Sequence, residues 1–321
     1  MSRVAPRLKI GDEVRIVCPS SSLQKSDADN RKKIIEGFKK HGLKVSFANH
    51  CFNQSATAKE RAEDLIKAFR DNSVSGVWAG TGGFSSIEIL PCIDLRELSN
   101  KILCGYSDIT VLLNAIYAKT GLITYHAPNA GAVGQNEFAD CFIKKALFNK
   151  EVFNLESSEE WSETIRDEDH PDGIDHSYQN SGWWPLNPAG IVEGRLIGGN
   201  LTCFSYLKST QFMPSLKGSI LFIEDDYETQ GHHFSALFES LMLNDKFKGV
   251  EAILIGRFQR ASGVDREYLT NLVSKNPPLQ YVPIIANVDF GHTKPQLTLP
   301  IGGIVQVTCL PDRQSIKIIE H

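Results

Sequence analysis

Short apolar runs alternate with amphipathic stretches in the first half of the chain. Residues 13–18, 43–47 and 74–79 are brief runs of mainly apolar side chains, which predicts strands. Residues 28–41 have helical composition. Residues 58–72 carry apolar side chains at positions 0, 3, 4 and 7 of a helical repeat (Ala62, Leu65, Ile66 and Phe69). Strands that alternate with helices predict a parallel sheet covered by helices.

The second half is richer in predicted strands. Apolar runs predict six of them, at residues 194–197, 219–224, 252–255, 284–287, 304–309 and 315–319. Helical patterns lie at 201–207 and 233–243. A length of 321 residues favours two domains over one core. We therefore predict an α/β protein with an N-terminal parallel-sheet domain (1–150) and a smaller C-terminal α/β domain with a mixed sheet (185–321).

The segment between these domains has a different character. Residues 151–184 are acidic and polar, show no sustained periodicity, and contain Trp161, Trp183 and Trp184, three of the four tryptophans. The segment is long for a loop inside a compact domain, so it is either a linker or a functional lid. Because large rings need a surface to pack against, we favour a lid or substrate-facing loop that carries these tryptophans.

Composition excludes several classes of protein. The formal net charge is −4, and no long run of Lys or Arg appears, so a nucleic-acid partner is not expected. The N-terminus has no signal-peptide pattern, and no window approaches the ~18 apolar residues of a membrane helix. The seven cysteines are scattered, without a CxxC pair. Free buried thiols are typical of a reducing compartment, so we expect a cytoplasmic protein without membrane association.

A serine stands where a predicted strand meets a predicted helix. In KILCGYSDITVLLNAIY, Ser107 follows the apolar strand and a glycine, and the amphipathic helix begins directly after it. The unpaired N–H groups of a helix N-terminus can stabilise an oxyanion, so Ser107 is a candidate nucleophile. Ser followed by Asp is also a common N-cap, and both interpretations stay open. The sequence is not GxSxG, so an α/β-hydrolase elbow is not indicated.

A glycine-rich turn follows another predicted strand. Residues 80–83 read GTGG, and adjacent glycines let the backbone approach a ligand and point an N–H at it. A simple turn is the alternative. The turn is neither GxGxxG nor a phosphate loop, so a nucleotide fingerprint is absent.

An acid and a histidine complete the candidate chemistry. Glu224 is the first acid at the end of the apolar strand in SILFIEDDYE, and His292 follows Gly291 after another strand, in NVDFGHTKPQLTLP. Glu224 could orient His292 as a general base. The alternatives are a solvated acidic turn for Glu224 and a structural role for His292. A cation site at the acidic residues of SILFIEDDYE is disfavoured, because the histidines that follow this segment lack metal-ligand spacing relative to it. His126, in TYHAPN, is a further candidate for the wall of a site.

Together, eight segments resemble the LD-carboxypeptidase family of serine peptidases, which includes microcin C self-immunity proteins. In chain order they are RIVCPSSS, GTGGF, GYSDIT, YHAP, EGRLIGGNLT, LFIEDD, ILIGRF and DFGHTKPQLTLPIGG, and they extend from about residue 12 to 307. The resemblance implies an N-terminal and a C-terminal α/β domain with the active site in the cleft between them. It also implies a homodimer that needs no metal or cofactor.

The resemblance assigns roles to individual residues. It implies a catalytic triad of Ser107 as nucleophile, His292 as base and Glu224 as the acid that orients it. It further implies an oxyanion hole formed by the backbone N–H groups of Gly83 and Asp108. Asn200 of GGNLT is expected to line the substrate site.

The resemblance leaves two classes of substrate. The immunity branch cleaves the amide between an aminoacyl group and a nucleotide-like moiety, and the tryptophans at 161, 183 and 184 favour this peptidyl-nucleotide substrate. The immunity branch stacks the nucleobase between two tryptophans of this loop. At the position expected for the second one, this chain has an acidic stretch without tryptophan, residues 166–175. The alternative is a murein tetrapeptide LD-carboxypeptidase that releases D-alanine. The carboxylate of that D-alanine requires a cationic group, and Arg166 is the only basic residue in the middle of the loop. A different class is a non-catalytic protein that binds peptidoglycan fragments or nucleotide-peptides.

Overall fold

The N-terminal half of the chain forms the predicted parallel sheet. The computed structural model describes residues 2–23, 28–165 and 173–321. Six strands lie in the order β14-β5-β4-β3-β1-β2, and all neighbours are parallel except the pair β14 and β5. The strands are β1 (Glu13–Val17), β2 (Lys44–Phe47), β3 (Val74–Ala79), β4 (Ile102–Gly105), β5 (Thr124–His126) and β14 (Leu299–Ile301).

Three helices connect consecutive strands of this sheet as the sequence predicts: α1 (Ala28–Lys40), α2 (Ala58–Arg70) and α3 (Thr110–Thr120). A fourth helix, α4 (Glu137–Leu147), follows β5 and was not predicted. In α2, Thr57 and Glu60 form a reciprocal capping box, and the predicted apolar face is buried at Ala62, Leu65 and Phe69. The amphipathic pattern at residues 58–72 is therefore confirmed as a helix that packs its apolar face inward.

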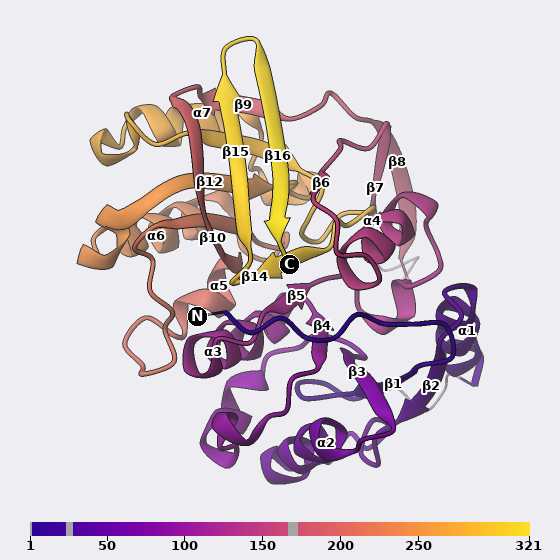
Figure 1. Ribbon diagram of the computed structural model, residues 1–321. Helices are drawn as coiled ribbons and strands as arrows, with labels where there is room; N and C mark the ends of the chain where they lie inside the picture. Colours follow the sequence, from indigo (N-terminus) through magenta and orange to yellow (C-terminus); the bar gives the residue numbers. More distant parts are fainter. Residues whose placement is uncertain (1, 24–27, 166–172) are drawn as a thin grey trace.

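The C-terminal half forms a mixed sheet of eight strands. Its order is β6-β16-β15-β10-β11-β12-β13-β9, with β10 to β13 parallel and the flanking pairs antiparallel. The strands are β6 (Phe153–Asn154), β9 (Trp184–Asn187), β10 (Gly190–Asn200), β11 (Ser219–Glu224), β12 (Val250–Gly256), β13 (Ile284–Val288), β15 (Ile304–Leu310) and β16 (Arg313–Glu320). The helices are α5 (Leu201–Ser205), α6 (Gly231–Met242) and α7 (Arg266–Ser274). Figure 1 shows this half, orange to yellow, above the indigo and magenta half.

Short 3-10 helices complete the connections. They are η1 (Ser86–Cys92), η2 (Leu95–Glu97), η3 (Ser107–Ile109), η4 (Ala130–Ala132), η5 (Asp245–Gly249), η6 (Arg260–Ser262) and η7 (Pro277–Leu279). Within the described parts of the chain, no helix combines the length and the apolar character that crossing a bilayer requires. Five of the seven cysteines are buried, and Cys92 and Cys141 are exposed.

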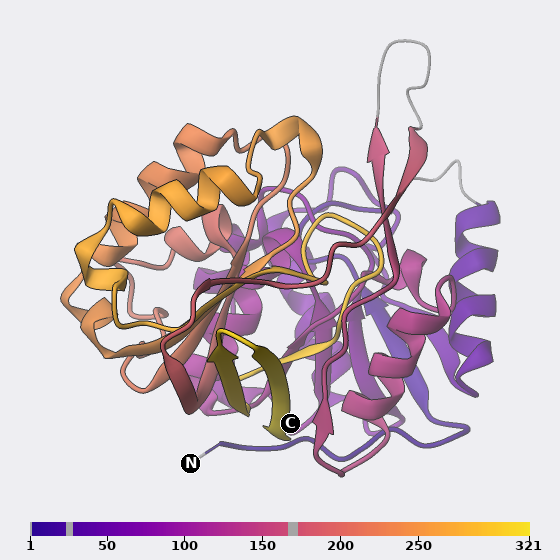
Figure 2. The ribbon, with the colours of Figure 1, turned by 90° about the horizontal axis from the view of Figure 1, so that it is seen from above.

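The segment predicted as an irregular lid or linker contains regular structure. Strands β7 (Glu160–Ile165) and β8 (Ile174–Gln179) form an antiparallel hairpin, which stands out from the body of the molecule in Figure 2. At its two ends, β6 and β9 join opposite edges of the C-terminal sheet. Residues 166–172, which include Arg166 and most of the acidic stretch, lie outside the described residues.

Candidate active site

The chain between β4 and α3 holds Ser107 in an unusual backbone conformation. Ser107 has φ +61°, a left-handed value that is rare outside glycine and is often found at functional positions. A Cβ on Gly105 would lie 2.8 Å from Ile109 Cγ2, so only glycine fits there. The N-cap position of η3 belongs to Tyr106, and no side-chain cap forms. The capping interpretation of Ser107 is therefore not supported, and its side chain bonds elsewhere.

Three side chains from distant parts of the chain form one hydrogen-bonded series. Ser107 Oγ lies 3.1 Å from His292 Nε2, and His292 Nδ1 lies 2.7 Å from Glu224 Oε2. Ser107 follows β4, Glu224 ends β11, and His292 lies in the loop after β13. Glu224 is fully buried, whereas the side chain of His292 is 16% exposed. The structure thus brings together the serine, histidine and acid that the sequence singled out.

The buried acid and the histidine shift each other's pKa. Burial alone would lower the pKa of His292, but the charge and hydrogen bond of Glu224 outweigh burial and raise it to about 9. Asp226 and Asp225 act in the same direction. Burial alone would raise the pKa of Glu224, but His292 holds it below its usual value. The pair therefore favours an ionised acid beside a strongly basic imidazole.

Glycines allow the close approach of these groups. A Cβ on Gly291, which has φ +109°, would lie 2.9 Å from Glu224 Oε2. A Cβ on Gly82 would lie 3.0 Å from Ser107 Cβ and 3.6 Å from the backbone nitrogen of Asp108. The Gly82–Gly83 turn therefore lies directly against Ser107 and the start of η3.

Asp108 makes buried hydrogen bonds that hold the chain next to Ser107 in place. Its fully buried carboxylate accepts hydrogen bonds from Ser20 Oγ at 2.5 Å and from the Ser86 backbone N–H at 2.8 Å. Ser86 Oγ in turn donates to the Asp108 carbonyl at 2.6 Å. These contacts join the segments after β1, β3 and β4, and they fix the backbone directly after Ser107.

Asn200 lies at the edge of the site with its side chain engaged. It is 3% exposed, caps α5 by accepting from the Cys203 N–H, and donates through Nδ2 to Asp225 Oδ1 at 2.9 Å. Burial, and then the charge of Glu224, raise the pKa of Asp225 to about 6. Asn200 therefore supports the acidic end of β11, and its contact with substrate stays a prediction. Among the described residues, no group of three or more His, Cys, Asp or Glu is arranged to hold a metal.

His126 lies behind the reactive groups as part of a buried wall. It is fully buried, with its ring 5.9 Å from Tyr106 and 5.4 Å from Phe222. Burial lowers its pKa to about 4, so the imidazole is neutral at ordinary pH. Tyr106 continues the wall, with its ring 5.2 Å from His292. The sequence pointed to His126, but nothing in it singled out Tyr106 except its place beside Ser107.

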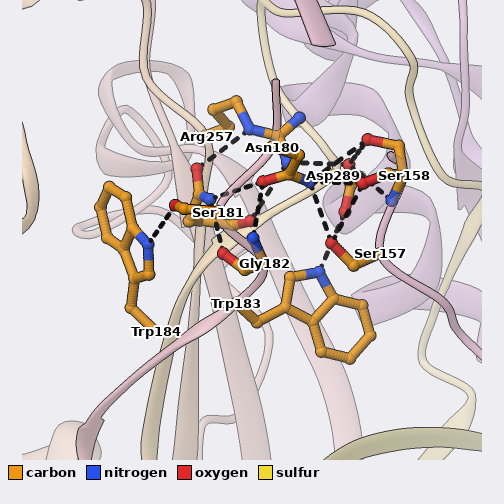
Figure 3. A network of polar contacts seen from close by, with 10 residues as sticks. Ser157, Ser158, Asn180, Ser181, Gly182, Trp183, Trp184, Arg257 and Asp289 are labelled. Carbon is orange, nitrogen blue, oxygen red and sulfur yellow. Dashed lines mark hydrogen bonds and ion pairs between the residues drawn. The ribbon is translucent and has the colours of Figure 1, made fainter. Parts of the chain in front are cut away.

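The three tryptophans of residues 151–184 pack against the protein. Trp183 Nε1 donates to Asp289 Oδ2 at 2.9 Å, and Trp184 Nε1 donates to Ser181 Oγ at 3.0 Å (Figure 3). Trp161 packs against Tyr178 across the hairpin, with ring centres 4.6 Å apart and the ring planes tilted by 38°. These rings are thus partly occupied by intramolecular contacts, and a role in binding substrate stays a prediction.

A buried ion pair holds the base of the hairpin. Arg257 Nη2 and Asp289 Oδ1 are 2.8 Å apart, and both side chains are almost fully buried. Asp289 also accepts from Ser158, just before β7, and from Trp183, after β8. Figure 3 shows these groups converging on the Asp289 carboxylate. This network was not predicted from the sequence, although Asp289 lies only three residues before His292.

The hairpin also contacts the loop that carries His292. Ser162 and Lys294 exchange two backbone hydrogen bonds of 2.8 Å. Lys294 Nζ lies 2.8 Å from Asp175 and 3.2 Å from Thr164 Oγ1. The hairpin is therefore fixed beside the site on the His292 side.

Comparisons with known proteins agree with this architecture. Residues 14–127 match the LD-carboxypeptidase N-terminal domain and residues 193–307 match the LD-carboxypeptidase C-terminal domain. A protein of Treponema pallidum named as a carboxypeptidase is 38% identical, with 98% of this chain and 94% of that protein covered. The microcin C7 self-immunity protein MccF of Escherichia coli is 31% identical, with 99% and 96% covered.

Solved structures share the whole fold. The crystal structure of an MccF-like protein from Bacillus anthracis superposes with a TM-score of 0.94 at 34% identity and covers 100% of both chains. MccF has also been solved in complex with aspartyl sulfamoyl adenosine, with a TM-score of 0.85, 29% identity, and 99% of this chain and 98% of that chain covered. This chain belongs to the LD-carboxypeptidase family of serine peptidases and has the two-domain α/β fold of the MccF structures.

Proposed function

We propose that the protein hydrolyses an aminoacyl or peptidyl amide with Ser107 as nucleophile, His292 as general base and Glu224 as the orienting acid. The observation that carries this proposal is the continuous series of hydrogen bonds from Ser107 Oγ through His292 to the buried Glu224. Membership of a serine peptidase family favours an enzyme over the non-catalytic binding protein.

The geometry supports a two-step mechanism. Glu224 accepts from Nδ1–H, which leaves Nε2 free to take the Ser107 proton as Oγ attacks the carbonyl carbon. When the tetrahedral intermediate collapses, the C–N bond breaks and His292 returns that proton to the leaving nitrogen. Water, deprotonated by His292, then attacks the acyl ester. When this second intermediate collapses, the C–Oγ bond breaks, His292 returns the proton to Ser107 Oγ, and the carboxylic acid is released.

The oxyanion of the intermediate requires donors on the other side of Ser107. We assign this role to the backbone N–H groups of Gly83 and Asp108, because the Gly82–Gly83 turn lies against Ser107 and Asp108 is the second residue of the 3-10 helix that begins at Ser107. The contacts of Asp108 with Ser20 and Ser86 hold both donors in place before substrate binds.

Two substrates remain in contention. The complex of MccF with aspartyl sulfamoyl adenosine supports an aminoacyl-nucleotide, which the tryptophans of residues 151–184 also favour. The murein tetrapeptide alternative needs a cation for the terminal carboxylate on the leaving-group side. Lys294, two residues after His292, supports this alternative, although its Nζ is paired with Asp175. The homodimer and the cytoplasmic location stay predictions.

A parallel hydrolysis assay distinguishes between the two candidate substrates. Purified protein is offered an aminoacyl sulfamoyl adenosine and a tetrapeptide that ends in D-alanine, with Ser107→Ala as the blank. Cleavage of the adenosine compound alone assigns the immunity-type activity, and release of D-alanine alone assigns the carboxypeptidase activity. Cleavage of neither amide would contradict the proposed function.

The activity should depend steeply on pH. Only neutral His292 can accept the Ser107 proton, and its pKa of about 9 means that kcat/KM at pH 7 should be about 100-fold below its plateau. Asp226→Asn removes a charge that raises this pKa, so the midpoint of the pH profile should move to lower pH. Glu228→Gln, an exposed neighbour, is the matched control. An unchanged midpoint in Asp226→Asn would contradict the assignment of His292 as base.

A further inference from the structure

The loop that carries His292 has little backbone support of its own. It runs from the end of β13 to β14, and a hydrogen bond of 2.7 Å from the Leu297 N–H to the Asp289 carbonyl closes its base. Between these ends, the backbone of residues 291–293 makes no hydrogen bond to another backbone group of the described chain. Regular structure therefore does not fix the backbone of the proposed base.

One buried side chain anchors this part of the loop. Gln296 is 7% exposed, and its Nε2 donates to the carbonyl of Gly291, the residue before His292. Within the described parts of the chain, this is the only hydrogen bond to the backbone of residues 291–293. Gly291 is buried, and a buried carbonyl without a partner is costly, so the Gln296 carboxamide holds this carbonyl in place.

The same carboxamide also contacts the residue before the nucleophile. Burial raises the pKa of Tyr106 to about 12, and a hydrogen bond between its hydroxyl and Gln296 acts in the opposite direction. A carboxamide has two N–H hydrogens, so it can serve the Gly291 carbonyl and the Tyr106 oxygen together. Gln296 thus connects the segment that holds Ser107 with the loop that holds His292.

Tyr106 in turn lies against the imidazole of His292. Their ring centres are 5.2 Å apart, with the planes inclined by 57°. The imidazole is therefore supported by Glu224 at Nδ1, by the ring of Tyr106, and through its backbone by Gln296. A misplacement of about 1 Å between reacting groups can cost about 100-fold in rate, so these supports affect how well Nε2 meets Ser107 Oγ.

We propose that Gln296 is a positioning residue that fixes His292 against Ser107 by joining the Gly291 carbonyl to the Tyr106 hydroxyl. The inference rests on the proposed hydrolase function and adds a residue to its machinery. Because Gln296 is almost fully buried, it acts through His292 and not on the substrate. Its loss should therefore lower kcat and leave KM unchanged.

The test replaces Gln296 with methionine, which is also unbranched but has no N–H group. We expect kcat, and the rate at which a fluorophosphonate modifies Ser107, to fall about 10- to 100-fold, with KM within about 2-fold of the wild type. The midpoint of the pH profile should fall below about 9, because a looser contact with Glu224 raises the pKa of His292 less. Gln280→Met, at an exposed glutamine, is the matched control and should behave as the wild type.

A second variant distinguishes positioning from general destabilisation. Tyr106→Phe keeps the ring beside His292 and removes only the hydroxyl, so it should lower the rate about 3-fold. Because Gln296→Met already removes the same contact, adding Tyr106→Phe to it should cause no further loss. Losses that multiply in the double variant would contradict the shared role. If Gln296→Met melts below the assay temperature, Tyr106→Phe decides alone: a lower kcat at unchanged KM supports the inference, and a wild-type kcat refutes it.

The remaining outcomes separate this inference from the proposed function. An unchanged kcat and pH midpoint in Gln296→Met, or a raised KM at unchanged kcat, would overturn the inference and leave the catalytic assignment intact. If the wild type hydrolyses no amide and forms no adduct, the proposed function fails, and the pKa of His292 is measured by NMR instead. The charged and titratable groups near His292 are the same in the wild type and in Gln296→Met, namely Glu224, Asp225, Asp226 and His126. A lower pKa in the variant would still support the positioning role, and an equal pKa would refute it.

Discussion

Replacing Ser107 with alanine should lower kcat by about 10⁴- to 10⁶-fold on whichever amide the protein hydrolyses. The substitution removes the one atom that bonds to the substrate carbon and leaves His292 and Glu224 paired. Alanine is as large as serine at Cβ and adopts the same φ of +61° at similar cost, so the fold should be retained. Initial rates and thermal melting of the variant measure the two expectations separately.

Ser209→Ala is the matched control for this substitution. Ser209 is exposed on the segment after α5, so both its rate and its melting temperature should equal those of the wild type. If Ser107→Ala hydrolysed the substrate at more than about one tenth of the wild-type rate, another group would have to be the nucleophile.

Replacing Glu224 with glutamine should lower kcat by about 10⁴-fold. Glutamine has nearly the same shape, but its amide can donate to His292 Nδ1 and stabilise the tautomer whose Nε2 carries the proton. That tautomer cannot accept the Ser107 proton. Loss of the buried charge also removes the main cause of the raised pKa of His292, so the residual activity should reach its plateau at lower pH.

The neighbouring acid provides the comparison for Glu224→Gln. Glu228→Gln changes the same chemical group four residues later, where the side chain is exposed, and should retain most of the wild-type kcat. Equal losses in the two variants would point to the overall negative charge of this turn instead of the orientation of His292. The pH profile of the residual rate distinguishes the two explanations.

The strands that carry the reactive residues could be predicted from the sequence, because each is a short apolar run that ends at or just before a polar residue. The strand before Ser107 is buried throughout, and so is the strand that ends at Glu224. The sequence therefore places each residue at the carboxyl end of a strand, where ligands bind in open α/β sheets. The two strands belong to different sheets, so local pattern does not show that their ends meet. Their hydrogen bonds were not foreseeable, since 185 residues separate Ser107 from His292.

The hairpin β7–β8 left no clear pattern in the sequence. Its strands have few buried side chains, so the apolar alternation of a half-buried strand is missing. Its stability comes from contacts with remote residues, including Lys294 and the Arg257–Asp289 ion pair at its base. The same long-range contacts explain the tryptophans: Trp183 reaches Asp289, 106 residues away, and neither composition nor spacing reveals that partner.

One strand crosses from the C-terminal part of the sequence into the N-terminal sheet. Leu299–Ile301 pairs with Thr124–His126, so residues 185–321 do not all belong to one sheet. The strand follows the His292 loop, and its pairing with β5 places that loop over the end of β4. Local pattern identifies neither partner, because the pairing is set by where the loop must lie relative to Ser107.

The most direct measurement is mass spectrometry of the protein after reaction with a fluorophosphonate, which forms a covalent bond only with an activated serine. We expect a single adduct on the tryptic peptide that contains Ser107, formed faster as the pH rises towards 9 and strongly slowed in Glu224→Gln. An adduct on a different residue, or no adduct on protein that hydrolyses its amide substrate, would contradict the assignment of Ser107, His292 and Glu224 as the catalytic groups.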